Sequence, residues 1–142
     1  MNEGQTMVKK KKSIHETTTT VIVDDETAVT SIEEDQAFEN LSARLAEIRK
    51  CDGVVGYILR SATSATIDLK EPAKIIEYAI LSSQVLDSSR EISELFDIGD
   101  VESILVEGKD IKALCMTIGE NKISIFMEKN ADHADVLYRV LP

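Results

Sequence analysis

Two segments of this sequence are apolar on both of their alternating faces, and this feature constrains the fold more than any other. In residues 111–118 one face carries Ile111, Ala113, Cys115 and Thr117, and the other carries Leu114, Met116 and Ile118. Residues 54–59 are also apolar on both faces. A strand of an antiparallel sheet with one face in water should alternate between apolar and polar residues. We therefore expect a sheet that helices cover on both faces.

The rest of the pattern supplies those helices and the remaining strands. Apolar residues at helical spacing predict a helix over 35–50, and Pro72 in a first-turn position opens a long helix that we expect to reach Phe96. Strands are expected over 54–60, 65–69, 101–107, 111–118 and 122–128, and a last short helix over 132–141. The predicted fold class is α/β (α+β): a three-layer α/β/α sandwich around a five-stranded antiparallel sheet, with element order α-β-β-α-β-β-β-α.

Residues 1–34 differ in character from residues 35–142, which are uniform in composition. The first segment contains a run of four lysines, a run of four threonines and a later acidic run. Opposed charge blocks without an apolar period predict a flexible low-complexity tail. The alternative is that residues 18–23, which have strong β-propensity, pair with a sheet edge.

The negative net charge of the chain makes polyanionic partners unfavourable. The chain has 16 Lys and Arg against 26 Asp and Glu, which gives a net charge of −10. This sign disfavours nucleic acid and anionic membrane surfaces. Because the sequence shows neither a run of about 20 apolar residues for a spanning helix nor a secretory signal, we expect no membrane insertion and a cytoplasmic location.

The sequence carries no complete catalytic or metal-binding motif, which favours a protein that is not an enzyme. His133 lies between Asp132 and Asp135, but these spacings do not converge on one helical face, and a helix start explains them better. Gly108-Lys109 lacks the flanking residues of a phosphate-binding loop. We therefore nominate no catalytic, cofactor-binding or metal-ligating residue and no cofactor.

The predicted long helix hints at an oligomer. We expect its core-facing side to carry Leu81, Val85, Leu86, Ile92 and Phe96. Ile76 and Ile80 lie on the otherwise polar side, where another chain could bury them. Scattered exposed isoleucines remain the alternative.

The order of elements and three stretches of sequence resemble the Roadblock/LC7 domain family. These stretches are Leu45–Gly56, Ile98–Gly108 and Lys122–Met127, and the resemblance spans residues 35–142. It implies a profilin-like fold with sheet order 2-1-5-4-3. It also implies a dimer in which third strands pair edge to edge and long helices pack together.

The resemblance also implies a function. It predicts a non-catalytic dimeric regulator or scaffold of a small Ras-like GTPase, whose partner chain is a second copy or a paralogous Roadblock chain. The candidate dimer-interface residues are Ile76, Ile80, Val101, Ser103 and Leu105. The alternative function is a small-ligand-binding sensor domain, since helix-covered sheets of this size also occur in signalling modules.

Overall fold

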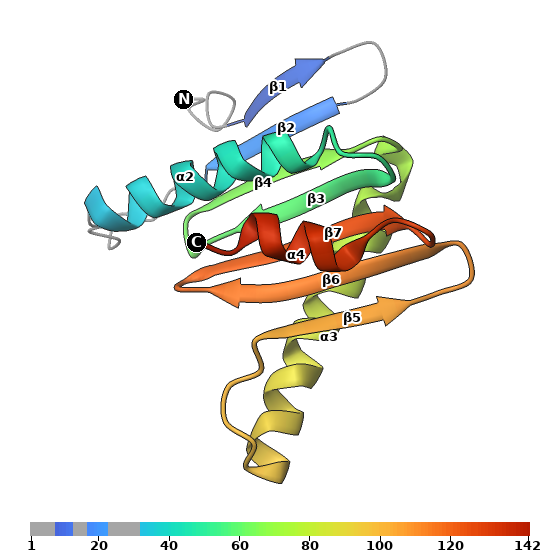
Figure 1. The fold of residues 1–142 in the computed structure, drawn as a ribbon. Helices are drawn as coiled ribbons and strands as arrows, with labels where there is room; N and C mark the ends of the chain where they lie inside the picture. The colour runs from blue at the N-terminus through green and yellow to red at the C-terminus, as the bar shows by residue number, and fades with distance from the viewer. Residues whose placement is uncertain (1–7, 13–16, 23–31) are drawn as a thin grey trace.

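The computed structural model describes residues 8–12, 17–22 and 32–142 (Figure 1). Its elements are β1 (Val8–Lys12), β2 (Thr17–Ile22), α2 (Ile32–Ile48), β3 (Val54–Arg60), β4 (Ser64–Leu69), the 3-10 helix η1 (Pro72–Lys74), α3 (Ile75–Phe96), β5 (Ser103–Glu107), β6 (Ile111–Ile118), β7 (Asn121–Glu128) and α4 (His133–Val140).

The five strands from β3 to β7 form the predicted antiparallel sheet. Their spatial order is β4-β3-β7-β6-β5, which corresponds to the expected order 2-1-5-4-3. The hairpins β3–β4, β5–β6 and β6–β7 are sequential, and the long connection through α3 carries the chain from β4 to the opposite edge. Since α2 precedes β3, α3 links β4 to β5 and α4 follows β7, the element order α-β-β-α-β-β-β-α is confirmed for this part of the chain.

The N-terminal segment adds two strands where a flexible tail was expected. β2 pairs antiparallel with β4 along its whole length, and β1 pairs with β2, so the sheet has seven strands. The alternative prediction was that residues 18–23 pair with a sheet edge. Residues 18–22 do so, and Val23 lies outside the part of the chain that the structure describes. The threonine run explains the difference, because Thr has high β-propensity and β4 offers it an edge. The expected tail residues 1–7, 13–16 and 23–31 also lie outside the described part of the chain.

Helices cover both faces of the sheet, as the doubly apolar strands predict. On one face, α2 and α4 pack against the side of the sheet that carries Leu114 and Met116. On the other face, α3 packs against the side that carries Ala113 and Cys115. Figure 1 shows α2 and α4 in front of the sheet and α3 behind it. The three-layer sandwich is therefore confirmed.

The helix ends differ from the predicted ones for identifiable reasons. α2 begins at Ile32, three residues before the predicted start at residue 35, so Asp35 lies in its first turn beside Glu33 and Glu34, where carboxylates interact favourably with the helix dipole. Pro72 opens a single 3-10 turn before α3 begins at Ile75. No α-helix among the described residues is long and apolar enough to cross a membrane.

Candidate functional site

The outer edge of β5 is an open strand edge. β5 pairs with β6 from Ser103 to Glu107 and ends the strand order on that side, so its second row of backbone groups faces outward. Its residues are only partly buried, and Leu105 packs against the core under α2 and α4. An apolar edge of this kind is a template for pairing with another strand.

The C-terminal part of α3 runs past this edge. Figure 1 shows the last turns of the helix extending beyond β5, away from the sheet. Large apolar side chains here face solvent: Leu95 is 75% exposed and Phe96 is 66% exposed. Ile92 and Ile98 are also exposed. We call these four residues, Ile92, Leu95, Phe96 and Ile98, the overhang.

The overhang corrects one prediction about α3. Ile92 and Phe96 were expected to face the core together with Leu81, Val85 and Leu86, and only the last three pack against it. The apolar stripe does continue along the helix, but β5 is the last strand and nothing in the described chain lies beneath the final turns. The apolar stripe of α3 therefore extends past the edge of the sheet, and its last residues stay exposed to solvent.

The tip of α3 is closed by a local turn that returns the chain to β5. Asp97 ends the helix in the left-handed region at φ 53°, and its backbone N–H and that of Ile98 bond to the carbonyl of Ser93. The Ser93 hydroxyl donates to the carbonyl of Gly99, which has φ 80°. Such αL geometry at a helix end satisfies carbonyls that would otherwise lack donors. The tip is therefore a defined structure that presents apolar side chains.

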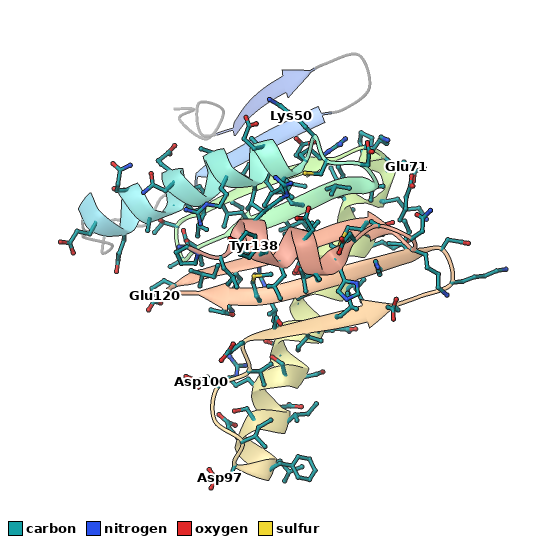
Figure 2. The ribbon with its side chains drawn as sticks, in the orientation of Figure 1. Lys50, Glu71, Asp97, Asp100, Glu120 and Tyr138 are labelled. Atoms are coloured by element: carbon teal, nitrogen blue, oxygen red, sulfur yellow. The ribbon has the colours of Figure 1, made fainter. Side chains whose placement is uncertain are left out.

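Carboxylates lie next to the overhang. Four exposed acidic residues adjoin it in the sequence, Glu91, Asp97, Asp100 and Glu102, while Glu94 lies on the opposite flank of α3, with Ile76. Figure 2 shows Asp97 at the C-terminal tip of α3 and Asp100 in the connection that leads from this tip to β5. The candidate surface thus combines an apolar centre with a negative rim.

Three of the five predicted interface residues lie in or beside the open-edge strand, and the side chain of Leu105 lies on the sheet face opposite α3. Ser103 and Leu105 lie in β5, and Val101, expected within the strand, lies just before it. Ile76 and Ile80 lie near the other end of α3 and are both exposed.

These two isoleucines occupy a different flank of the helix from the overhang. Sixteen residues separate Ile76 from Ile92 and Ile80 from Phe96, so at about 100° per residue each pair is rotated by about 160°. A symmetric contact between two copies of α3 uses one flank. The two sets of residues therefore predict different dimers, which substitutions can distinguish.

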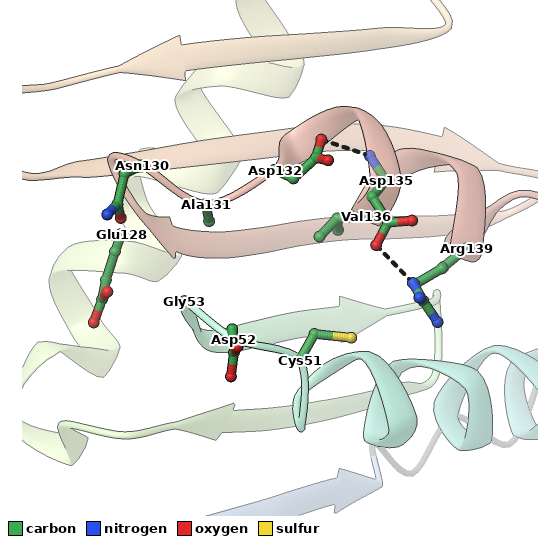
Figure 3. A pocket seen from close by; sticks show the side chains of 10 residues that line it. All are labelled: Cys51, Asp52, Gly53, Glu128, Asn130, Ala131, Asp132, Asp135, Val136 and Arg139. Carbon is green, nitrogen blue, oxygen red and sulfur yellow. Dashed lines mark hydrogen bonds and ion pairs between the residues drawn. The ribbon is translucent and has the colours of Figure 1, made fainter.

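A hollow lies on the other side of the molecule, between the α2–β3 turn and α4. It has a volume of about 600 Å³, and Figure 3 shows its lining, which comes from the α2–β3 turn (Cys51 to Gly53), from Glu128 at the end of β7, and from α4 and the segment that leads into it. Asp132 caps α4 by accepting a hydrogen bond from the backbone N–H of Asp135, at 3.1 Å. Arg139 donates to the Asp135 carboxylate at 2.8 Å, and this bond raises the pKa of the guanidinium. Because these polar groups already bond one another, the hollow gives little support to a specific ligand site.

The residues considered for a metal site have structural roles. Asp132 is the N-cap of α4, as a helix start predicts. Nζ of Lys112, a buried lysine of β6, donates to Nδ1 of His133 at 2.9 Å. Among the described residues no three His, Cys, Asp or Glu side chains are grouped so that they could hold a metal ion.

No protein-family model matches the sequence, and no curated protein matches it. In structure the chain is similar to the crystal structure of a Roadblock/LC7 domain from Streptomyces avermitilis, with a TM-score of 0.57 and 21% sequence identity. The match covers 70% of this chain and 83% of that one. The chain therefore has the fold of Roadblock/LC7 domains, as the resemblance in its sequence predicts.

Proposed function

We propose that this chain is a non-catalytic dimeric module that regulates or scaffolds a small Ras-like GTPase in the cytoplasm. The observation that carries the dimer is the overhang of α3 beside the open edge of β5. Burying the apolar side chains at this tip against a partner would lower the free energy by about 25 cal/mol for each Å² of apolar surface removed from water. A partner surface that covers both features at once would stabilise the complex.

A two-fold arrangement meets this requirement with a single surface. If the β5 strands of two copies pair antiparallel, the two sheets become continuous, and the same patch on each copy contacts its equivalent. Each overhang then projects beneath the partner's sheet, since α3 lies on one face and extends past β5. The proposed interface consists of Ser103 and Leu105 in β5, Val101 before it, and the overhang.

The acidic rim bears on whether the partner is a second copy or a paralogue. A homodimer brings two negative rims together, which opposes association at low salt. A paralogous Roadblock chain with a basic rim would pair more strongly. We propose the homodimer as the form of the isolated protein, and the paralogue as a competitor for the same surface.

The GTPase partner follows from the Roadblock/LC7 resemblance and from what the chain lacks in sequence. It contains no phosphate-binding loop of the G-x-x-x-x-G-K-[ST] type, which favours a nucleotide-dependent role through a second protein. A rigid, helix-covered sheet with one apolar edge is suited to holding partners in place.

The test is co-elution with small Ras-like GTPases from the same source, each loaded in parallel with GDP or with a non-hydrolysable GTP analogue. We expect at least one to co-elute in one nucleotide state and not in the other. The rate of GTP hydrolysis in the complex then separates a regulator from a scaffold. Failure of every GTPase to bind in either state would contradict the proposed function and leave the fold unaffected.

A further inference from the structure

The two ends of the seven-stranded sheet differ in charge. β5, at one end, has the sequence Ser-Ile-Leu-Val-Glu. β1, at the other end, has the sequence Val-Lys-Lys-Lys-Lys, in a chain whose net charge is −10. Four of the 16 basic residues of the protein therefore lie consecutively in one edge strand.

The hairpin that contains β1 covers a strand that would otherwise be an edge. β2 pairs with β4 over all six of its residues, from Thr17 opposite Leu69 to Ile22 opposite Ser64. β1 pairs with β2 over all five of its own. The backbone groups on the outer side of β4 therefore have partners within the same chain.

A sheet with two open edges can polymerise. If β1 of one copy pairs with β5 of the next, the contact is head-to-tail, and it generates an open filament instead of a closed dimer. Natural sheets avoid this outcome by making one edge unfavourable for pairing, and lysines in the edge strand are one such device.

The lysines of β1 oppose both kinds of pairing. Antiparallel pairing of two β1 strands places lysine opposite lysine, and like charges directly across a ladder are destabilising. Head-to-tail pairing would set the run of four lysines in β1 against the apolar stretch Ile104–Val106 of β5, and removing charges from water without opposite charges to pair with is costly. Pairing of two β5 strands involves no lysine.

We infer that the β1–β2 hairpin is an edge cap, which covers β4 and ends the sheet in a lysine strand that a second copy of the chain does not pair with. Self-association is thereby confined to β5. This inference depends on the proposed function only for the expected wild-type mass, that of a dimer formed through β5. The edge cap itself lies at the other end of the sheet, at β1.

The test compares three variants of the full chain by light scattering over a concentration series. In the first, Lys9, Lys10, Lys11 and Lys12 are all replaced by Thr, which keeps high β-propensity and removes the charge. In the second, the same four lysines are replaced by Glu, which restores like-charge repulsion. The matched control replaces four exposed lysines that lie outside the strands: Lys50, Lys70, Lys109 and Lys129, each by Thr. Both threonine variants lower the net charge by the same four units.

We expect the first variant to reach at least double the wild-type mass as concentration rises, while the glutamate variant and the control keep the wild-type mass. Hydrogen exchange should show that the β4 amides that bond β2 stay protected in all three, which establishes that the hairpin remains in place. Unchanged mass in the first variant would overturn the inference. Growth of the control or of the glutamate variant would also overturn it, as would growth that accompanies loss of β4 protection. A monomeric wild type would contradict the proposed dimer, and the comparison among variants would still decide the role of the cap.

Discussion

Ser82 of α3 and Ser124 of β7 place their hydroxyl oxygens 2.5 Å apart in the buried layer between the helix and the sheet. Ser124 in turn donates to Sγ of Cys115, at 3.1 Å. All three side chains are buried, so this short polar chain ties α3 to the sheet at one point within an otherwise apolar layer. The position of α3 matters because it determines how far the overhang projects.

This contact predicts a strongly non-additive pair of substitutions. Ser124→Ala leaves the buried hydroxyl of Ser82 without this partner, which should lower the free energy of unfolding by about 1–3 kcal/mol. The double variant Ser82→Ala/Ser124→Ala removes both groups and should cost less than the sum of the single changes. Urea unfolding of the four proteins measures the coupling. Additive losses would show that the two hydroxyls do not interact.

Gly56 in β3 should not tolerate even a methyl group. A Cβ built there would lie 2.4 Å from the backbone oxygen of Asp68 and equally close to a side-chain carbon of Leu69. The backbone oxygen belongs to the paired strand β4, so it cannot move aside without disturbing the ladder. We expect Gly56→Ala to destabilise the fold by about 1–3 kcal/mol or more, as overpacking does. Thermal and urea unfolding would reveal the loss, and wild-type stability would contradict the packing described.

The thiol of Cys115 should make stability depend on pH in the alkaline range. Burial raises the pKa of this thiol above the ordinary value of 9.0, and the hydrogen bond from Ser124 offsets only part of the effect. Above that ordinary value the unfolded chain loses the proton while the folded chain keeps it, so the free energy of unfolding falls as pH rises.

The matching variant is Cys115→Ala, which lacks the ionisable group. Between neutral pH and the range just above 9.0, the wild type should lose more stability than the variant does. Comparing the two proteins also cancels the contribution of Tyr78, whose pKa burial raises as well. Parallel pH profiles would show that the Cys115 thiol ionises equally in both states.

The acidic rim of the overhang predicts that salt strengthens the homodimer. In the proposed dimer, Glu91 and Asp97 of each copy come close to those of the other, and their repulsion is screened as the Debye length falls from about 30 Å at 0.01 M salt to about 10 Å at 0.1 M. The dimer dissociation constant, measured by sedimentation, should therefore decrease as salt is raised. Weaker association at higher salt would indicate an interface held by ion pairs between opposite charges.

Much of the fold was predictable because its apolar patterns are local. The strand over 54–60 and the strand over 111–118 match β3 and β6, since both are apolar on each face and bounded by turn residues. The helical spacing of Phe38, Leu41 and Leu45 likewise identifies α2, although not its first turn.

The features that the sequence did not predict depend on tertiary structure, that is, on where each helix or strand ends relative to its neighbours in space. Periodicity identifies the stripe that includes Ile92 and Phe96, but it does not show that the sheet stops before the helix does. The charge blocks of residues 1–34 predict a flexible tail, although this segment contains β2. The partner of β2 is β4, which lies more than forty residues away in sequence. The buried ion pair between Arg49 and Asp68, at 3.5 Å, leaves no pattern in the sequence either.

The most direct test of the dimer is light scattering on a size-exclusion column, with wild type, Phe96→Glu and Ile76→Glu measured at equal concentration. Phe96 and Ile76 are 66% and 75% exposed, so neither change should disturb the monomer's core, and circular dichroism can check that each variant folds. We expect the wild type and Ile76→Glu at twice 15.7 kDa, and Phe96→Glu at 15.7 kDa. A monomeric wild type, or dissociation by Ile76→Glu but not by Phe96→Glu, would contradict a dimer built on β5 and the overhang.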